Sequence, residues 1–275
     1  MKNVILYLLA TLTAVNAMPV MGEESSLVER QAGITSNDVK NGQCMPVTFV
    51  MARGSTEQGN MGSIAGAPTC AGLKQKMPGQ VACQGVGAED GYAAALPPNF
   101  QPKNTDDQSI AAATKIINMA MTQCPNTTMV IGGYSQGSAV MDNAIQGLPQ
   151  ASQDKVAGVV FFGYTRNAQD NGQVPGYPQA QTKIFCAQGD LVCDNTLTIT
   201  AAHLSYGANA DAAATFLAQM AGGATGATTG AATGATKATK SAKKTKTKVV
   251  SRDAVENMAA EFEAAKIEAR EIEME

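Results

Sequence analysis

Residues 128–137 read Thr-Met-Val-Ile-Gly-Gly-Tyr-Ser-Gln-Gly, a β-prone run followed by the pattern Gly-x-Ser-x-Gly. After this pattern, apolar residues recur at helical spacing from Ala139 to Ile145. In a nucleophile elbow, a serine lies on a sharp turn between a strand and a helix, and the two glycines give the backbone room. The stretch therefore predicts a strand, a turn at Ser135 and a helix. The alternative is a turn of small residues where a helix packs on a sheet.

The chain has one histidine, His203, and it lies downstream of Ser135. A serine hydroxyl becomes a good nucleophile when a base takes its proton, and histidine is the usual base near neutral pH. If the chain carries out serine–histidine chemistry, these two residues must perform it.

A carboxylate must orient the histidine, and in hydrolases with this elbow it lies between the serine and the histidine in the chain. Asp190 fits best, because it follows the apolar run 183–187 and so falls at the C-terminal end of an expected strand. Cys186 and Cys193 lie on either side of it, and a bridge between them would hold the carboxylate still. The alternative interpretation of Asp190 is an ordinary turn residue.

The other aspartates of this segment fit less well. Asp194, just outside the cysteine pair, is the second choice for the orienting carboxylate. Asp142 lies one to two turns into the expected helix, so we expect it to point away from the site. Asp154 and Asp170 lie in polar, turn-rich stretches and are expected to be solvated loop residues.

The body of the chain alternates β-prone runs with helical stretches. Strands are expected at residues 47–51, 81–86, 129–132, 156–162 and 183–187, and helices at 63–76, 106–124, 135–146 and 211–220. Apolar runs such as Val159-Val160-Phe161-Phe162 indicate strands that are buried on both faces, which is typical of a parallel sheet. We therefore expect an α/β fold, a three-layer α/β/α sandwich with a central, mainly parallel sheet and a site at the carboxyl ends of the strands.

Five blocks are informative together: Arg53-Gly54-Ser55-Thr56-Glu57, Gly132-Gly133-Tyr134-Ser135-Gln136-Gly137, Gly163-Tyr164-Thr165-Arg166-Asn167, Gly189-Asp190-Leu191-Val192-Cys193 and His203-Leu204-Ser205-Tyr206-Gly207. In order and spacing they resemble the cutinase family of secreted serine esterases, from about residue 44 to residue 220. The resemblance implies a compact, lidless α/β-hydrolase type of fold. It also implies that Ser135 is the nucleophile, Asp190 the orienting carboxylate and His203 the base.

The same resemblance implies further site residues. The oxyanion hole would consist of the backbone N–H groups of Ser55 and Gln136, assisted by the Ser55 hydroxyl, with Asn99 as a buttress. The residues alone already require the N–H after the nucleophile and one from an earlier loop. No cofactor is expected. A metal site is not expected either, since the chain has no Cys-x-x-Cys spacing and one histidine is too few.

Apolar residues near the expected triad point to the substrate class. In the resembling family these positions form apolar rims around an open cleft, and here they are Leu96, Leu197, Ile199 and Leu204. As a set they favour an acyl chain over a hydrophilic sugar, although each could instead be a core residue. Thr198 and Thr200 make the rim more polar, which weakens the case for very long chains.

The chain has six cysteines, and six allow fifteen pairings, among which the sequence alone cannot choose. The resemblance implies the pairs Cys44–Cys124, Cys70–Cys83 and Cys186–Cys193. Such bonds persist outside the cell.

Residues 1–17 combine Lys2, an apolar run and a small-residue cleavage site, as a secretory signal peptide does. Residues 18–42 are polar without periodicity and are expected to be a leader, trimmed near Arg30. Asn126-Thr127-Thr128 is an acceptor for N-glycosylation if it lies on the surface. We therefore expect a secreted, extracellular protein whose catalytic domain spans residues 43–221.

The C-terminal part differs in composition. Residues 222–250 are rich in Gly, Ala, Thr and Lys and are expected to be a flexible linker, and residues 251–275 are a charged, helix-prone tail. We expect a monomer, with at most weak association through the tail. A net charge of −3 gives no indication of a nucleic-acid partner, and no stretch outside the signal peptide suggests a membrane partner.

The sequence thus predicts a secreted serine esterase that hydrolyses cutin and short- to medium-chain acyl esters, with a polyester surface as its partner. An acetylxylan esterase on the same scaffold is the first alternative, against which the 53–57 block and the apolar rim argue. A non-catalytic secreted protein that binds surfaces is the second alternative, and the intact set of Ser135, Asp190 and His203 argues against it.

Overall fold

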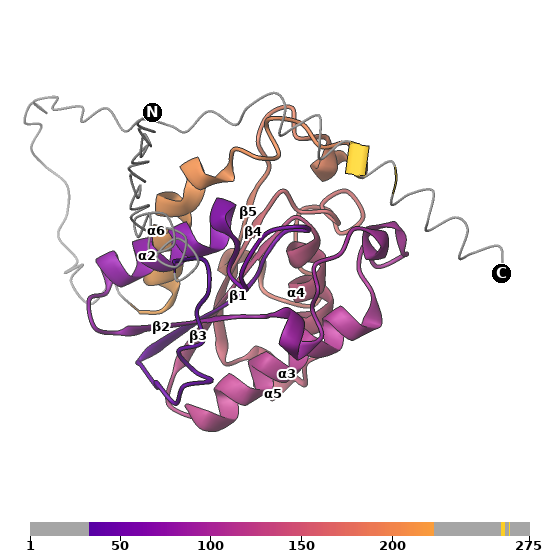
Figure 1. The fold of residues 1–275 in the computed structure, drawn as a ribbon. Coiled ribbons are helices and arrows are strands. Elements are labelled where there is room, and N and C mark those ends of the chain that lie inside the picture. The colour runs from indigo at the N-terminus through magenta and orange to yellow at the C-terminus, as the bar shows by residue number, and fades with distance from the viewer. Residues whose placement is uncertain (1–32, 223–259, 262–263, 265–275) are drawn as a thin grey trace, which may run out of the picture.

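A five-stranded sheet runs through the middle of the computed structural model, which describes residues 33–222 and residues 260, 261 and 264 (Figure 1). The strands are β1 Val47–Ala52, β2 Val81–Gly85, β3 Thr128–Tyr134, β4 Val156–Phe162 and β5 Thr182–Phe185. Their order is β2-β1-β3-β4-β5, and every neighbouring pair is parallel. The sheet that the sequence predicts as mainly parallel is therefore wholly parallel.

Helices cover both faces of this sheet (Figure 1). They are α2 Ala67–Lys76, α3 Asp107–Gln123, α4 Gln136–Gln146, the short α5 Gln150–Gln153 and α6 Ala210–Met220, and a π-helical turn at Gly62–Gly66 precedes α2. The pair α2 and α6 lies on one face, and α3 and α4 lie together on the other. The predicted three-layer α/β/α sandwich is thus confirmed.

The two faces have separate cores because side chains alternate along each strand. In β4, Val159 and Phe161 pack with α3 and α4, whereas Val160 and Phe162 pack with α2 and α6. All four are fully buried. This explains why β4 reads as a continuous apolar run rather than as an alternating one.

Residues 33–42 pack against the domain, which differs from their assignment to a leader. Val39 is fully buried in the core beneath α3, and Asn37 forms an antiparallel bridge with Gln84 at the outer edge of β2. The Asp38 carboxylate accepts a hydrogen bond from the Cys83 N–H at 2.9 Å. An edge strand gains from such a cover, and residues 37 and 38 supply it along β2. The signal peptide and residues 18–32 lie outside the described residues.

Three disulfides tie elements of the fold together, and they are the pairs that the resemblance implies. Cys44–Cys124 joins the segment before β1 to the end of α3, Cys70–Cys83 joins α2 to β2, and Cys186–Cys193 closes the loop after β5. The first spans 80 residues, for which the chain-entropy model gives about 4 kcal/mol of stabilisation.

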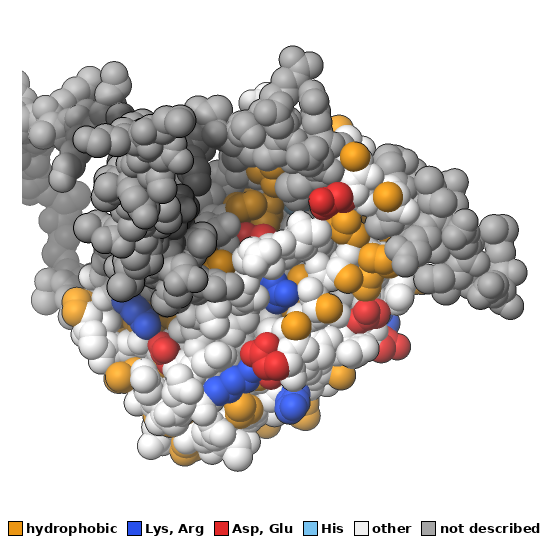
Figure 2. All heavy atoms as spheres, in the orientation of Figure 1, with side chains coloured by type: hydrophobic (Ala, Val, Ile, Leu, Met, Phe, Trp, Pro, Cys, Tyr) orange, Lys and Arg blue, Asp and Glu red, His pale blue; other side chains and the backbone are white. Residues whose placement is uncertain are grey.

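Charged side chains are interspersed with neutral ones on the face that Figure 2 shows, and Lys and Arg do not gather into one patch there. Among the charged side chains of the described residues, Lys40 pairs with Glu89 and Asp90. Within the described part of the chain, no helix combines the length and apolar character that crossing a bilayer requires. Of the linker and tail, only Gly222 and the exposed helical residues Ala260, Glu261 and Ala264 are described, so their predicted roles are not tested.

Candidate active site

Ser135 lies between the end of β3 and the start of α4, on the turn that the sequence predicts. Its backbone has φ 53° and ψ −126°, a strained conformation for a residue with a side chain. The Ser135 N–H donates to the carbonyl of Phe162 on β4 at 2.9 Å, which fixes the turn to the sheet.

The two glycines of the motif are needed because backbone approaches closely at both positions. A Cβ at Gly133 would lie 2.6 Å from the carbonyl oxygen of Gly137, and a Cβ at Gly137 would lie 2.2 Å from that of Ala52. No real side chain tolerates such contacts. Local sterics thus explain why the sequence pattern identifies this turn.

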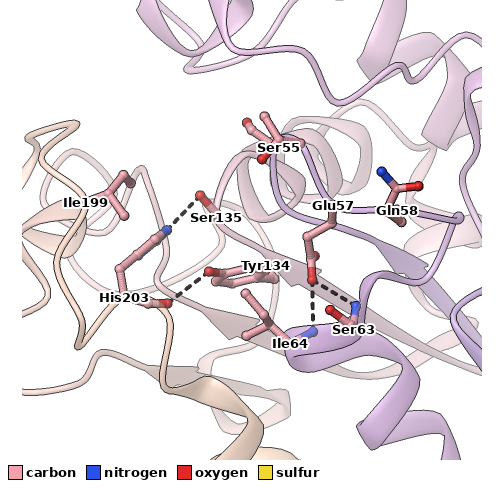
Figure 3. Close-up of a pocket in the computed structure, with 10 residues that line it drawn as sticks. Ser55, Glu57, Gln58, Ser63, Ile64, Tyr134, Ser135, Ile199 and His203 are labelled. Atoms are coloured by element: carbon pink, nitrogen blue, oxygen red, sulfur yellow. Dashed lines mark hydrogen bonds between the residues drawn. The ribbon is translucent and has the colours of Figure 1, made fainter. Parts of the chain in front are cut away.

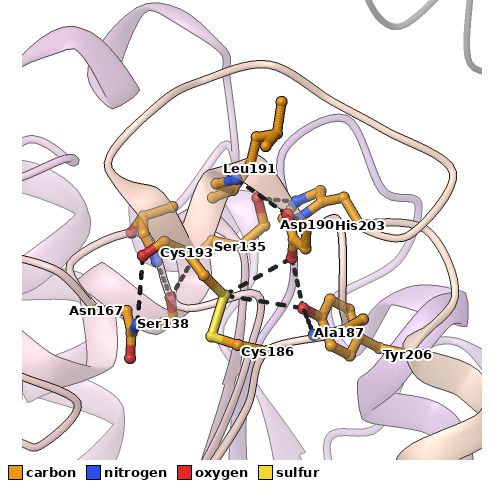
Figure 4. The surroundings of a disulfide bond; sticks show 12 residues. Ser135, Ser138, Asn167, Cys186, Ala187, Asp190, Leu191, Cys193, His203 and Tyr206 are labelled. Atoms are coloured by element: carbon orange, nitrogen blue, oxygen red, sulfur yellow. Dashed lines mark hydrogen bonds and ion pairs between the residues drawn. A yellow bond between two sulfur atoms is a disulfide. The ribbon is translucent and has the colours of Figure 1, made fainter.

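Ser135, His203 and Asp190 form a continuous hydrogen-bonded series (Figures 3 and 4). The Nε2 atom of His203 lies 2.9 Å from Ser135 Oγ, and its Nδ1 atom lies 3.0 and 2.9 Å from the two carboxylate oxygens of Asp190. Because a carboxylate only accepts, Nδ1 carries the proton and Nε2 is free to accept one from the serine. All three side chains are at most 5% exposed.

The loop after β5 holds Asp190 (Figure 4). The Cys186–Cys193 disulfide closes this loop, and the Val192 N–H donates to Asp190 Oδ1 at 3.0 Å. Burial alone would raise the pKa of Asp190, but the hydrogen bonds from His203, Tyr206 and the Val192 backbone hold it below its ordinary value. Asp190 is therefore ionised near neutral pH.

Two backbone N–H groups are available next to Ser135. The Gly54 N–H donates to the Glu57 carboxylate, and the Thr56 N–H donates to the Ala94 carbonyl. The Ser55 N–H between them has no acceptor among the described residues. The Gln136 N–H is the first of α4, where a helix offers no internal acceptor. The side chain of Asn99, which is buried, donates to Ser55 Oγ at 3.0 Å. These groups can bind a developing oxyanion.

Glu57 has a role that sequence reasoning missed (Figure 3). Its carboxylate accepts hydrogen bonds from the N–H groups of Gly54, Ser63 and Ile64 at 2.8, 2.9 and 2.9 Å. Burial raises the pKa of Glu57, although these three donors and Arg53 act against the shift. The carboxylate thus joins the loop that carries Ser55 to the turn that leads into α2. A glutamate beside a Gly-Ser-Thr run is the only sequence signal that could have indicated it.

A cavity of about 210 Å³ opens beside Ser135 and is lined by Ser55, Thr56, Glu57, Gln58, Ser63, Ile64, Tyr134, Ser135, Ile199 and His203 (Figure 3). Of the predicted substrate-binding side chains, Ile199 alone is in this lining. Leu96, Ile199 and Leu204 are less than 10% exposed and pack with Val192, with Leu197 packed against them. The predicted apolar rim is therefore mostly a buried cluster. Among the described residues, Leu191 is the one large apolar side chain that is exposed, at 38%.

The surroundings of two other aspartates, Asp142 and Asp170, differ in part from those that the sequence predicts. Asp142 is fully buried, with Arg166 Nε 3.3 Å from its Oδ2 and Gln146 donating to the same oxygen at 2.9 Å. Asp170 was expected to be solvated, yet its side chain is 8% exposed and pairs with Arg166 at 2.8 Å. Arg166 pairs with both carboxylates. The polarity of the sequence around each aspartate does not predict this pairing. Burial, followed by the nearby Asp170 charge, raises the pKa of Asp142 to about 7.

This raised pKa has a consequence for stability. As the pH rises from 3.8 to about 7, the unfolded state releases the Asp142 proton first, so stability falls through this window and stays lower above it. Asp142→Asn should therefore stabilise the protein at pH 8 by about 1–2 kcal/mol, after allowance for the lost ion pair, and should have little effect at pH 4. Urea unfolding at both pH values measures this, with the exposed Asp154→Asn as the control. Equal effects at the two pH values would contradict the prediction.

The wholly parallel sheet with a serine elbow at the end of β3 defines a protein of the α/β-hydrolase class. Comparison with known proteins narrows the class, since the model of the cutinase family matches residues 43–221. "Probable cutinase 3" of Neosartorya fischeri is 60% identical over 192 residues, which are 70% of this chain and 88% of that protein. The chain belongs to the cutinase family and is a carboxylic ester hydrolase.

Solved structures agree with this assignment. The Trichoderma reesei cutinase, in complex with a C11Y4 phosphonate inhibitor, has a TM-score of 0.62 and 31% identity, covering 73% of this chain and 85% of that one. An acetylxylan esterase has a TM-score of 0.52 and 23% identity, covering 65% of this chain and 99% of its own, and shares the fold alone.

Proposed function

We propose that this chain is a secreted cutinase in which Ser135 is the nucleophile, His203 the general base and Asp190 the orienting carboxylate. The observation that carries the proposal is the continuous series of hydrogen bonds from Ser135 Oγ through His203 to Asp190, at one wall of the cavity. As Ser135 attacks an ester carbonyl, Nε2 of His203 takes its proton, and the ionised Asp190 stabilises the resulting imidazolium.

The oxyanion that forms on the carbonyl oxygen binds the N–H groups of Ser55 and Gln136. The Ser55 hydroxyl, whose oxygen accepts from Asn99, assists by donating its proton to the same atom. His203 then protonates the leaving alcohol, and an acyl group remains on Ser135. Water activated by His203 attacks this acyl-enzyme and regenerates the serine.

The substrates we propose are short- to medium-chain acyl esters and the polyester cutin. Ile64 and Ile199 give the cavity two apolar walls, and its volume of about 210 Å³ accommodates a short acyl chain. The burial of Leu96 and Leu204 leaves little exposed apolar surface for a very long chain, which argues against a preference for such chains.

Substrate comparison tests this proposal against the acetylxylan esterase alternative. The purified, oxidised full chain should hydrolyse p-nitrophenyl butyrate with a kcat/KM about tenfold above that for the acetate, because two further methylenes enter an apolar cavity. It should also release hydroxy fatty acids from a cutin film faster than acetate from acetylated xylan. Faster release of acetate from xylan would identify an acetylxylan esterase. Binding to cutin without any hydrolysis would favour the non-catalytic alternative.

Three further proposals concern the protein as a whole. We propose secretion through the signal peptide at residues 1–17, and N-glycosylation at Asn126, which is exposed in a turn after Cys124. Trimming near Arg30 would leave the packed residues 33–42 in place. We also propose that the catalytic domain acts as a monomer, with the tail at residues 251–275 giving at most weak association.

A further inference from the structure

Tyr206 contacts the triad but has no part in the mechanism described above (Figure 4). It follows His203 by three residues, begins the turn Tyr206–Asn209 before α6, and is fully buried. Its hydroxyl oxygen accepts a hydrogen bond from the Ala187 N–H at 3.0 Å and donates its proton to Asp190 Oδ2. Since the Ala187 N–H supplies the proton in the first bond, the single hydroxyl proton is directed at the carboxylate.

Each carboxylate oxygen of Asp190 therefore has a hydrogen-bond donor of its own in addition to His203. Oδ1 accepts from the Val192 N–H, Oδ2 accepts from Tyr206, and both face Nδ1 of His203. Two donors on different oxygens fix the plane of the carboxylate, which a single donor would leave free to rotate. Burial and the Asp190 charge raise the pKa of Tyr206, so its hydroxyl stays protonated and remains a donor.

The ring of Tyr206 is fixed by its packing. It lies edge-on to Tyr134, Phe162 and His203, with ring centroids 5.9, 6.0 and 6.1 Å away. Phe162 ends β4 and Tyr134 ends β3, so the carboxyl ends of two central strands set the position of the hydroxyl. Tyr206 thus connects the sheet, the loop of Asp190 and the segment that carries His203.

We propose that Tyr206 is a positioning residue of the triad, whose hydroxyl orients the Asp190 carboxylate and takes up part of its negative charge. This inference rests on the proposed roles of Ser135, Asp190 and His203. The shared charge tempers the attraction of Asp190 for a protonated His203. Without the hydroxyl, the imidazolium is stabilised more strongly in the resting enzyme, and the carboxylate is less well aligned during proton transfer.

The titratable groups near this arrangement are few among the described residues. Tyr134 donates to the carbonyl of His203 at 2.9 Å, and burial raises its pKa well above the ordinary value. The negative charge of Glu57 also acts on Tyr134, in the same direction as burial. Neither group bonds to Asp190, so a change in the pH profile on altering Tyr206 reports on the Asp190–His203 pair.

The test is Tyr206→Phe in the full chain, with Tyr177→Phe as a matched control. Tyr177 is also buried, and its hydroxyl donates to the Val156 carbonyl at 2.8 Å, away from the triad. Tyr206→Phe should lower kcat for p-nitrophenyl butyrate about tenfold at a KM within about twofold of wild type, the effect of one lost charge-assisted hydrogen bond. The acid limb of its kcat/KM profile should move up by about half a pH unit. Tyr177→Phe should change neither quantity.

A second substitution keeps the test decisive if Tyr206→Phe does not fold. Tyr206→3-fluorotyrosine, introduced at this site alone, preserves the packing and donates a stronger hydrogen bond, so the acid limb should move down instead. His203 is the only histidine, so NMR signals of its imidazole protons can be assigned without ambiguity. Their pH dependence, measured in wild type and in each Tyr206 variant with Ser135→Ala added, should move in the same direction as the acid limb. An acid limb that stays at the wild-type pH in the folded variants would overturn the proposal, as would a kcat loss no larger than that of Tyr177→Phe. Activity that survives Ser135→Ala would instead refute the proposed function itself.

Discussion

Ser135→Ala should lower kcat for p-nitrophenyl butyrate by roughly 10⁵-fold, because in the proposed mechanism the triad acts as a unit and the substitution removes the atom that forms the acyl-enzyme. The fold should be unaffected. Alanine keeps the Cβ of Ser135, so the strained turn meets the same contacts, and the N–H bond to Phe162 remains. Initial rates and circular dichroism on the same samples measure both expectations.

A buried serine away from the site serves as the control for this substitution. Ser109 lies in the first turn of α3 and is 4% exposed, and Ser109→Ala should keep its activity within about twofold because Ser109 lies outside the triad and the cavity lining. Mass spectrometry should find one adduct on Ser135 after treatment with an organophosphonate, and none on Ser135→Ala. More than about 1% residual activity in the variant would mean that another nucleophile acts, since a triad without its serine retains far less.

The parts of the site that the sequence predicts are those fixed by local rules. Gly133 and Gly137 are required by contacts within the elbow itself, so the pattern identifies the turn. Asp190 could be chosen because it follows a β-prone run and precedes the single histidine. Strand and helix positions follow from periodicity and agree with the structure to within a few residues at most ends.

Contacts between distant segments could not be predicted in this way. Val39 is buried in a core that residues of the sheet, α3 and α4 build together, and the burial of Asp170 depends on Arg166 and the neighbouring Asp142. Likewise, Leu96 and Leu204 come from separate loops that pack on each other. The apolar side chains that were expected to form an exposed rim therefore form a small buried cluster instead. Whether an apolar or charged loop residue is exposed is decided by tertiary packing, which a single sequence does not specify.

Glu57 makes tertiary contacts of this kind, and they support the proposed reaction. The carboxylate accepts three backbone N–H groups, one from Gly54 and two from the turn before α2, while Arg53 donates from its Nε to the Glu57 carbonyl at 2.7 Å. The next residue after Gly54 is Ser55, whose N–H has no acceptor among the described residues. The position of this proposed oxyanion donor therefore depends on the Glu57 carboxylate. A hydrogen-bond donor that already points at the position of the oxyanion before the reaction contributes about 3 kcal/mol of transition-state stabilisation.

Glu57→Gln should lower kcat about 100-fold with little change in KM, because the amide places an N–H₂ group against at least one of the three N–H donors and displaces the Ser55 loop. The free energy of unfolding should fall by about 2 kcal/mol, the cost of leaving a buried donor without an acceptor. Steady-state kinetics with p-nitrophenyl butyrate and urea unfolding measure the two effects. Glu89→Gln is the control, since its side chain is 59% exposed and forms an ion pair with Lys40. If Glu57→Gln kept kcat within twofold of wild type while losing stability, Glu57 would be structural only, and the Ser55 loop would hold its position without it.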